Sequence, residues 1–81
     1  MTPNPNAKVV GGLYITLRKP LPLRRYDGGG GNMYLVDHNI NRNDTVLVLS
    51  NWVNSRGVEF VQVLHENQTF YIESDSIGFA V

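Results

Sequence analysis

The chain contains no cysteine, so disulfide bonds, thiolate catalysis and zinc sites built on sulfur are excluded. It also lacks any apolar run near the roughly 18 residues that cross a bilayer. Residues 1–6 have neither the basic start nor the apolar stretch of a signal peptide. The sequence therefore predicts no membrane partner and no classical secretion, and it favours a location inside a cell or within a larger particle.

An excess of charge of one sign is absent as well, because seven basic and seven acidic residues give a formal net charge of zero. A neutral chain has no global attraction to nucleic acid or to anionic membranes. The charges are nevertheless segregated: residues 8–25 contain bases and no acid, whereas residues 57–81 contain acids and no base. These segments either attract each other, within the fold or between copies, or form two solvated faces of different sign.

Helical periodicity longer than one turn is also missing, and the apolar residues instead form short runs separated by polar turns. β-Branched and aromatic residues dominate these runs, which have the length of strands. The expected strands are residues 9–17 with a glycine break at 11–12, 33–36, 45–49, 58–64 and 69–72, with a short last strand over 77–81. Glu66 and Asn67 are the expected tip of a tight hairpin.

These runs predict an all-β fold, a small antiparallel barrel of five to six strands that forms a single domain over residues 8–81. Residues 1–7 precede it as an extended arm, since Pro3 and Pro5 disfavour a helix. Residues 18–32 are expected to form a long loop, with the tetraglycine at 28–31 as its flexible tip. Residues 51–57 are expected to form a polar loop around Trp52.

The central runs are apolar on both faces, because Val46 and Val48 alternate with Leu47 and Leu49. A sheet with one wet face would instead alternate between apolar and polar residues. We therefore expect barrel closure to cover one face of these strands. A loop, the N-terminal arm or a partner is expected to cover the other.

Residues 43–49, 57–63 and 70–72 resemble the strands of Src-homology-3-like (SH3-like) barrels, in particular the bacterial type. The resemblance covers about 30 residues within 43–72 and implies an SH3-like barrel. The aromatic signature of the eukaryotic members is absent: Gly12–Thr16 stands in place of Ala-Leu-Tyr-Asp-Tyr, and Phe60 is the aromatic nearest to the position of the binding tryptophan. The resemblance therefore implies the fold without the groove that binds polyproline.

Trp52, Tyr26, Arg18, Arg24 and Arg25 are the predicted partner-binding residues. Exposed tryptophan is a frequent anchor at interfaces, and the basic segment around the three arginines is a candidate anion site. The alternatives are a tryptophan folded back onto the core and a solvated loop stiffened by Pro20 and Pro22.

Catalysis and metal binding have no support in the sequence. His38 and His65 are the only histidines, and no second histidine or cysteine lies at ligand spacing from either. We therefore expect two ordinary surface histidines, no catalytic residues, no metal ligands and no cofactor.

The leading hypothesis is a non-catalytic protein–protein interaction module whose partner is another protein or a copy of the chain itself. The first alternative is a small structural subunit of a larger assembly such as a viral particle. The second alternative is weak binding of nucleic acid or another anion through the basic loop at residues 18–25, although neutral net charge disfavours nucleic acid.

Overall fold

The computed structural model describes residues 7–26 and 32–79. The predicted arm, apart from Ala7, and the tetraglycine lie outside the described residues. Within them, no helix is long and apolar enough to span a membrane. The elements are seven strands and one short 3₁₀ helix: β1 (Leu13–Thr16), β2 (Leu23–Arg25), β3 (Met33–Leu35), β4 (Thr45–Val53), β5 (Glu59–His65), β6 (Gln68–Glu73), η1 (Ser74–Ser76) and β7 (Ile77–Phe79).

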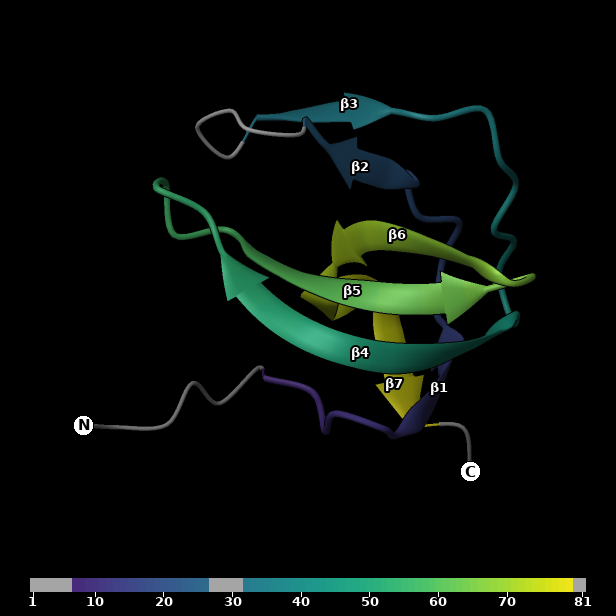
Figure 1. The fold of residues 1–81 in the computed structure, drawn as a ribbon. Helices are drawn as coiled ribbons and strands as arrows, with labels where there is room; N and C mark the ends of the chain where they lie inside the picture. Colours follow the sequence, from purple (N-terminus) through teal and green to yellow (C-terminus); the bar gives the residue numbers. More distant parts are fainter. Residues whose placement is uncertain (1–6, 27–31, 80–81) are drawn as a thin grey trace.

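The strands form a single antiparallel sheet in the order β3-β2-β6-β5-β4-β1-β7. Its centre is the meander β4-β5-β6, and Figure 1 shows the β2–β3 hairpin above the meander with β1 and β7 below it. The all-β prediction is confirmed. The sheet has seven strands instead of five or six, and β3 and β7 are its two edges among the described residues.

Strand β2 was not predicted. It lies inside residues 18–32, which we expected to form one long loop, so that expectation is wrong. Three residues, two of them arginines, give no alternation from which a strand could be predicted. The strand forms because Leu23 pairs with Leu35 on one side and with Tyr71 on the other. Its pairing partners, and not its own composition, make it extended.

Strand β4 also differs from the prediction, since it continues past Leu49 as far as Val53. Trp52 therefore lies in a strand, paired with Phe60, and not in a polar loop. The register shifts between Val48 and Ser50. This bulge lets one strand serve two parts of a strongly curved sheet.

The core fills the inner face of the sheet. Val61 and Val63 of β5 are fully buried there, as are the neighbouring side chains of β4 and β6. Burying an aliphatic side chain of this size contributes about 1.5–3 kcal/mol. The core cluster comprises Tyr14, Ile40, Val46, Val48, Val61, Val63, Phe70, Ile72 and Ile77.

The outer face is covered only in part. Leu13, Leu47 and Leu64 are opposed in register across β1, β4 and β5, and Leu13 is 58% exposed. The segment that directly follows the arm lies along β4 instead, where the Lys8 N–H donates to Asn51 Oδ1 at 2.8 Å. The described loops and the described part of the arm therefore leave the outer face partly uncovered, and its coverage by a partner stays a prediction.

The predicted turns are confirmed. Gly12 N–H donates to the Val9 carbonyl at 3.0 Å, with Gly11 at a φ of 83°. Glu66 and Asn67 have φ values of 51° and 64° between the paired residues His65 and Gln68. Two consecutive positive φ values are typical of the type I′ turn, whose twist matches that of the strands it joins.

Thr16 connects β1 to the loop that precedes β4. Its side chain is fully buried, and its hydroxyl donates to the Asn41 carbonyl and accepts from the Asp44 N–H at 2.9 Å. The backbone of the same residue bonds to Asn43 and Asp44. Thr16 therefore fixes the start of β4 against β1.

Replacing Thr16 with valine keeps its shape and removes the hydroxyl. We expect Thr16→Val to lower the free energy of unfolding by about 1–3 kcal/mol, because a buried N–H and a carbonyl lose their partner. Urea unfolding measures this loss. Thr16→Ser should retain more of the stability than Thr16→Val, and Thr45→Val, at an exposed site, should change it by less than about 0.5 kcal/mol. Equal stability of Thr16→Val and wild type would contradict the assigned role.

Candidate aromatic–arginine binding surface

Arg25 is the centre of the candidate site. Its guanidinium carbon lies 4.8 Å from the centroid of the Trp52 ring and 5.8 Å from that of the Tyr71 ring. These three residues come from β2, β4 and β6, so the curvature of the sheet brings them together. A guanidinium at this distance from aromatic faces is attracted by their quadrupoles.

Tyr26 and Arg24 extend the site along β2. The rings of Tyr26 and Tyr34 have centroids 4.7 Å apart. The Arg24 guanidinium carbon lies 5.1 Å from the centroid of the Phe70 ring, and its Nη2 donates to Gln68 Oε1 at 2.7 Å. The β2–β3 hairpin therefore carries arginines and tyrosines together.

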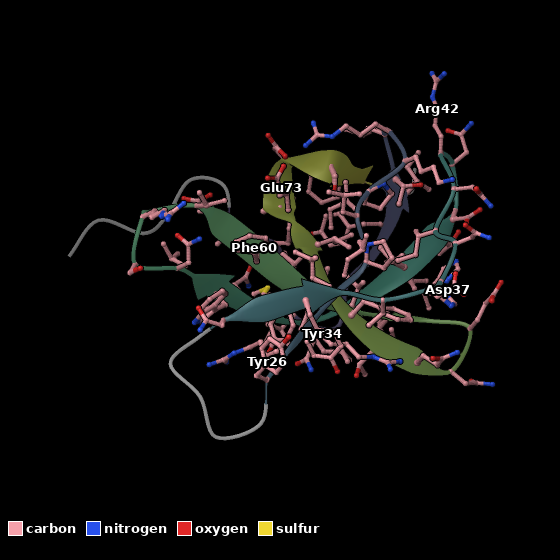
Figure 2. The ribbon with its side chains drawn as sticks, turned by 90° about the horizontal axis from the view of Figure 1, so that it is seen from above. Tyr26, Tyr34, Asp37, Arg42, Phe60 and Glu73 are labelled. Atoms are coloured by element: carbon pink, nitrogen blue, oxygen red, sulfur yellow. The ribbon has the colours of Figure 1, made fainter. Side chains whose placement is uncertain are left out.

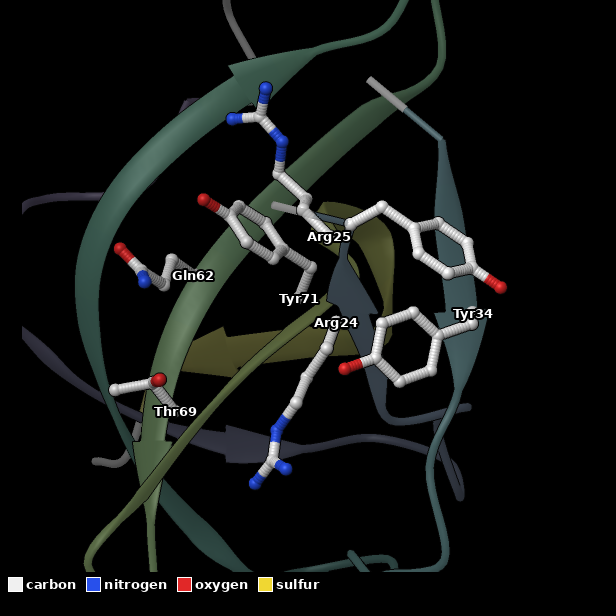
Figure 3. A pocket seen from close by; sticks show the side chains of 7 residues that line it. Arg24, Arg25, Tyr34, Gln62, Thr69 and Tyr71 are labelled. Atoms are coloured by element: carbon white, nitrogen blue, oxygen red, sulfur yellow. The ribbon is translucent and has the colours of Figure 1, made fainter. Parts of the chain in front are cut away.

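An open pocket of about 670 Å³ lies between these side chains and the outer face of β5 and β6 (Figure 3). Trp52 adjoins the pocket through its contacts with Arg25 and Tyr71. We call the pocket and this tryptophan the aromatic–arginine surface: Arg24, Arg25, Tyr26, Tyr34, Trp52, Gln62, Thr69 and Tyr71.

The two arginines of the surface have no acidic partner among the residues that the structure describes. Arg24 bonds to an amide, and the Arg25 side chain has aromatic contacts but no hydrogen bond to any described residue. As far as the described residues go, the guanidinium donors of Arg25 are unoccupied, and a guanidinium binds planar anions in a bidentate way.

Arg18 lies outside this surface. Its Nη2 contacts Glu73 Oε2 at 3.0 Å and Asp75 Oδ1 at 2.6 Å. It lines a smaller cavity of about 230 Å³ together with Pro20, Leu21 and Phe60, among others. The basic and acidic segments of the chain thus do attract each other within the fold, at this one arginine.

Trp52 is neither the fully exposed nor the fully buried tryptophan that the sequence left open. It is half-buried on the outer face, where its ring centroid lies 5.7 Å from that of Phe60 and 6.1 Å from that of Tyr71. Tyr34, Tyr71 and Gln62 were missed by sequence reasoning. Their only signal was the alternation along their strands, which does not say which outward-facing residues meet across the sheet.

The expectation of two ordinary surface histidines is wrong. His65 is buried and its Nδ1 lies 2.8 Å from Nε2 of His38, while its Nε2 lies 3.1 Å from Asp44 Oδ2. The His38 side chain is only 10% exposed. The two histidines are 27 positions apart, which is no ligand spacing along the sequence, and only the fold brings them together.

No protein-family model, curated protein or solved structure matches the chain.

Removing the Arg25 side chain should expose the ring beneath it. We expect Arg25→Ala to increase the quenching of fluorescence by acrylamide, and since Trp52 is the only tryptophan, the signal comes from this site alone. The free energy of unfolding should change by about 1 kcal/mol or less, as for an exposed cation–π pair.

Arg42→Ala is the matched control, because this arginine is exposed on the loop before β4 (Figure 2). Its quenching should equal that of the wild type. If Arg25→Ala also quenched like the wild type, the guanidinium would not cover the indole in solution.

Proposed function

We propose that the protein is a non-catalytic protein–protein interaction module with an SH3-like barrel fold, and that it binds its partner through the aromatic–arginine surface. The observation that carries this proposal is the Arg25 guanidinium, held over Trp52 and Tyr71 without an acidic partner among the described residues. Tryptophan, tyrosine and arginine are the residues most enriched at the energetic centres of protein interfaces.

The SH3-like part of the proposal is supported by the order of elements. The meander β4-β5-β6 covers the residues that carry the resemblance, and the tight Glu66–Asn67 turn lies where the family has its short hairpin. The pairing of β1 with β4 and β7 continues the curvature on the other side. More specifically, we propose an SH3-like barrel that closes between the two edge strands of the sheet, β3 and β7.

The partner that fits is an acidic, extended protein segment. A carboxylate of the partner accepts from the Arg25 guanidinium, whose donors have no hydrogen-bond acceptor among the described residues, and side chains beside the carboxylate pack on the exposed rings of Tyr26 and Tyr34. The rings already hold the arginine in place, which reduces the ordering cost of binding. The neutral charge of the whole chain makes this attraction local, so specificity comes from the surface itself.

Titration with a peptide that alternates glutamate and tyrosine tests this proposal. We expect saturable binding followed by Trp52 fluorescence, and a loss of at least tenfold in affinity for Arg25→Gln, because a hydrogen bond to a charged group contributes about 1.5–3 kcal/mol. A lysine–tyrosine peptide of equal length is the ligand control, and Arg42→Gln is the variant control.

Nucleic acid is the competing occupant of the same rings and guanidinium groups. An oligothymidylate titrated in parallel should bind more weakly than the acidic peptide. If the oligonucleotide bound more tightly than the peptide, and its affinity fell steeply as the salt concentration rose, the surface would be a nucleic-acid-binding site. If neither ligand bound, the proposed role of this surface would be wrong.

A second candidate function, a structural subunit of an assembly, is favoured by the apolar outer face of β1. Leu13 and Leu17 are 58% and 52% exposed, whereas Tyr14 and Thr16 between them are buried. The opposed Leu47 and Leu64 are half-buried and continue this strip across the sheet. Contiguous exposed apolar side chains of this kind mark protein contacts.

Light scattering after size-exclusion chromatography at micromolar concentration tests the assembly role. We expect the wild-type protein to self-associate and Leu13→Lys to be monomeric, because a charge on the strip opposes its burial. Val53→Lys, which is also exposed and in β4, should behave as the wild type. A strictly monomeric, folded wild type would contradict this candidate function.

A further inference from the structure

The loop between β3 and β4 passes beside the turn of the β5–β6 hairpin (Figure 1). Two histidines and a glutamate meet there, away from the centre of the aromatic–arginine surface. The closest ligand atoms are His38 Nε2 and His65 Nδ1, at 2.8 Å. Glu66 adds a carboxylate oxygen 4.0 Å from His38 Nε2. The three residues offer ligand atoms that all lie within 4.8 Å of one another.

We propose that His38, His65 and Glu66 bind a divalent transition-metal ion, with Zn²⁺ as the ion that fits best. Imidazole nitrogen and carboxylate oxygen are its usual ligands in sites without cysteine, and it accepts four ligands in tetrahedral geometry. Three protein ligands leave one position for water.

The hydrogen bonds around His65 set its tautomer. Asp44 Oδ2 accepts from the Asn41 N–H at 2.8 Å and lies 3.1 Å from His65 Nε2. A carboxylate oxygen accepts, so Nε2 carries the proton and donates to it. The lone pair of Nδ1 is therefore directed toward His38, which is where a metal ion would lie.

Metal-ligating histidines nearly always donate their other ring N–H to a carboxylate, a backbone carbonyl or water, and Asp44 would be that acceptor for His65. The Asp44 carboxylate is itself fixed by the Asn41 N–H, and the Asp44 N–H donates to the buried hydroxyl of Thr16. His38 is held on its other side, since its ring stacks on that of Phe70 with centroids 4.3 Å apart. Both imidazoles are thus positioned before any ion arrives.

The distances require only a small adjustment. Tetrahedral bonds of about 2.0–2.1 Å place ligand atoms about 3.3 Å from each other. The two nitrogens would separate by about half an ångström, while the exposed Glu66 carboxylate would move inward by about 0.7 Å relative to His38 and by up to about 1.5 Å within the cluster. His38 would release the proton that it shares with His65. Glu66 is 71% exposed, so the ion reaches the buried nitrogens from the solvent on that side.

Calorimetric titration of the tag-free protein with ZnCl₂ tests the site. We expect one Zn²⁺ per chain and no binding of Mg²⁺, which prefers oxygen ligands. At a free Zn²⁺ concentration one hundred times the dissociation constant, the midpoint of thermal unfolding should rise by more than about 10 °C.

Three variants separate a metal site from a purely structural histidine pair. Glu66→Gln and His38→Gln should each weaken Zn²⁺ binding at least tenfold, and Asp44→Asn should weaken it about 10- to 100-fold through the orientation of His65. Glu59→Gln, at the opposite end of β5, is the matched control and should bind as the wild type does.

Glu66→Gln is decisive if the histidine variant fails to fold, because this side chain is exposed and contributes nothing to the core. A structural pair would lose stability on mutation, but Zn²⁺ would not change the unfolding midpoint of the wild type. That result, or Zn²⁺ binding that both glutamine variants leave unchanged, would overturn the proposal.

Discussion

The structure depends on the central strand β5, which the short chain can bury completely on one face only. Val61 and Val63 are fully enclosed on the inner side, while Gln62 and Leu64 lie half-exposed on the outer side. A chain of 81 residues buries only about 60–65% of the surface it exposes when unfolded, and the described residues leave part of the second face exposed. Both surfaces that we assign to protein partners therefore lie on this outer face.

Phe70 joins the two candidate sites. The Arg24 guanidinium carbon lies 5.1 Å from the centroid of the Phe70 ring. The His38 ring stacks on the same ring, with the two centroids 4.3 Å apart. The phenyl ring itself is buried and paired with Val63. One core side chain therefore contacts a residue of each candidate site, His38 and Arg24. If occupancy of one site alters affinity at the other, thermodynamic linkage requires the reverse effect to be equally large.

The meander and its hairpin turn could be predicted because local rules govern them: alternation sets the strands, and the positive φ values of Glu66 and Asn67 suit a two-residue turn. Strand β2 could not, since its extended shape comes from partners about ten and fifty residues away, at Leu35 and Tyr71. The same limit applies to the functional residues. Residue type alone made Trp52 and Arg25 candidates, and their role stays a prediction, whereas the cluster around His65 exists only after the β3–β4 loop has packed against β5. The chemistry of a single side chain can be read from the sequence, whereas the contacts between distant side chains depend on the fold.

The strand order also has a kinetic consequence. The strands β4, β5 and β6 follow one another in sequence and pair through short turns, so their contacts close small loops at little entropic cost. The pairing of Tyr14 with Phe79 and of Leu13 with Leu47 joins residues far apart in the chain. Such pairs repay their closure cost only once the intervening sheet exists. We therefore expect the meander to form first, and β1, which carries the exposed leucines, to be added to it later. Until then the inner face beside Val46 and Val48 stays open, which is the stage at which a small β domain is most prone to aggregate.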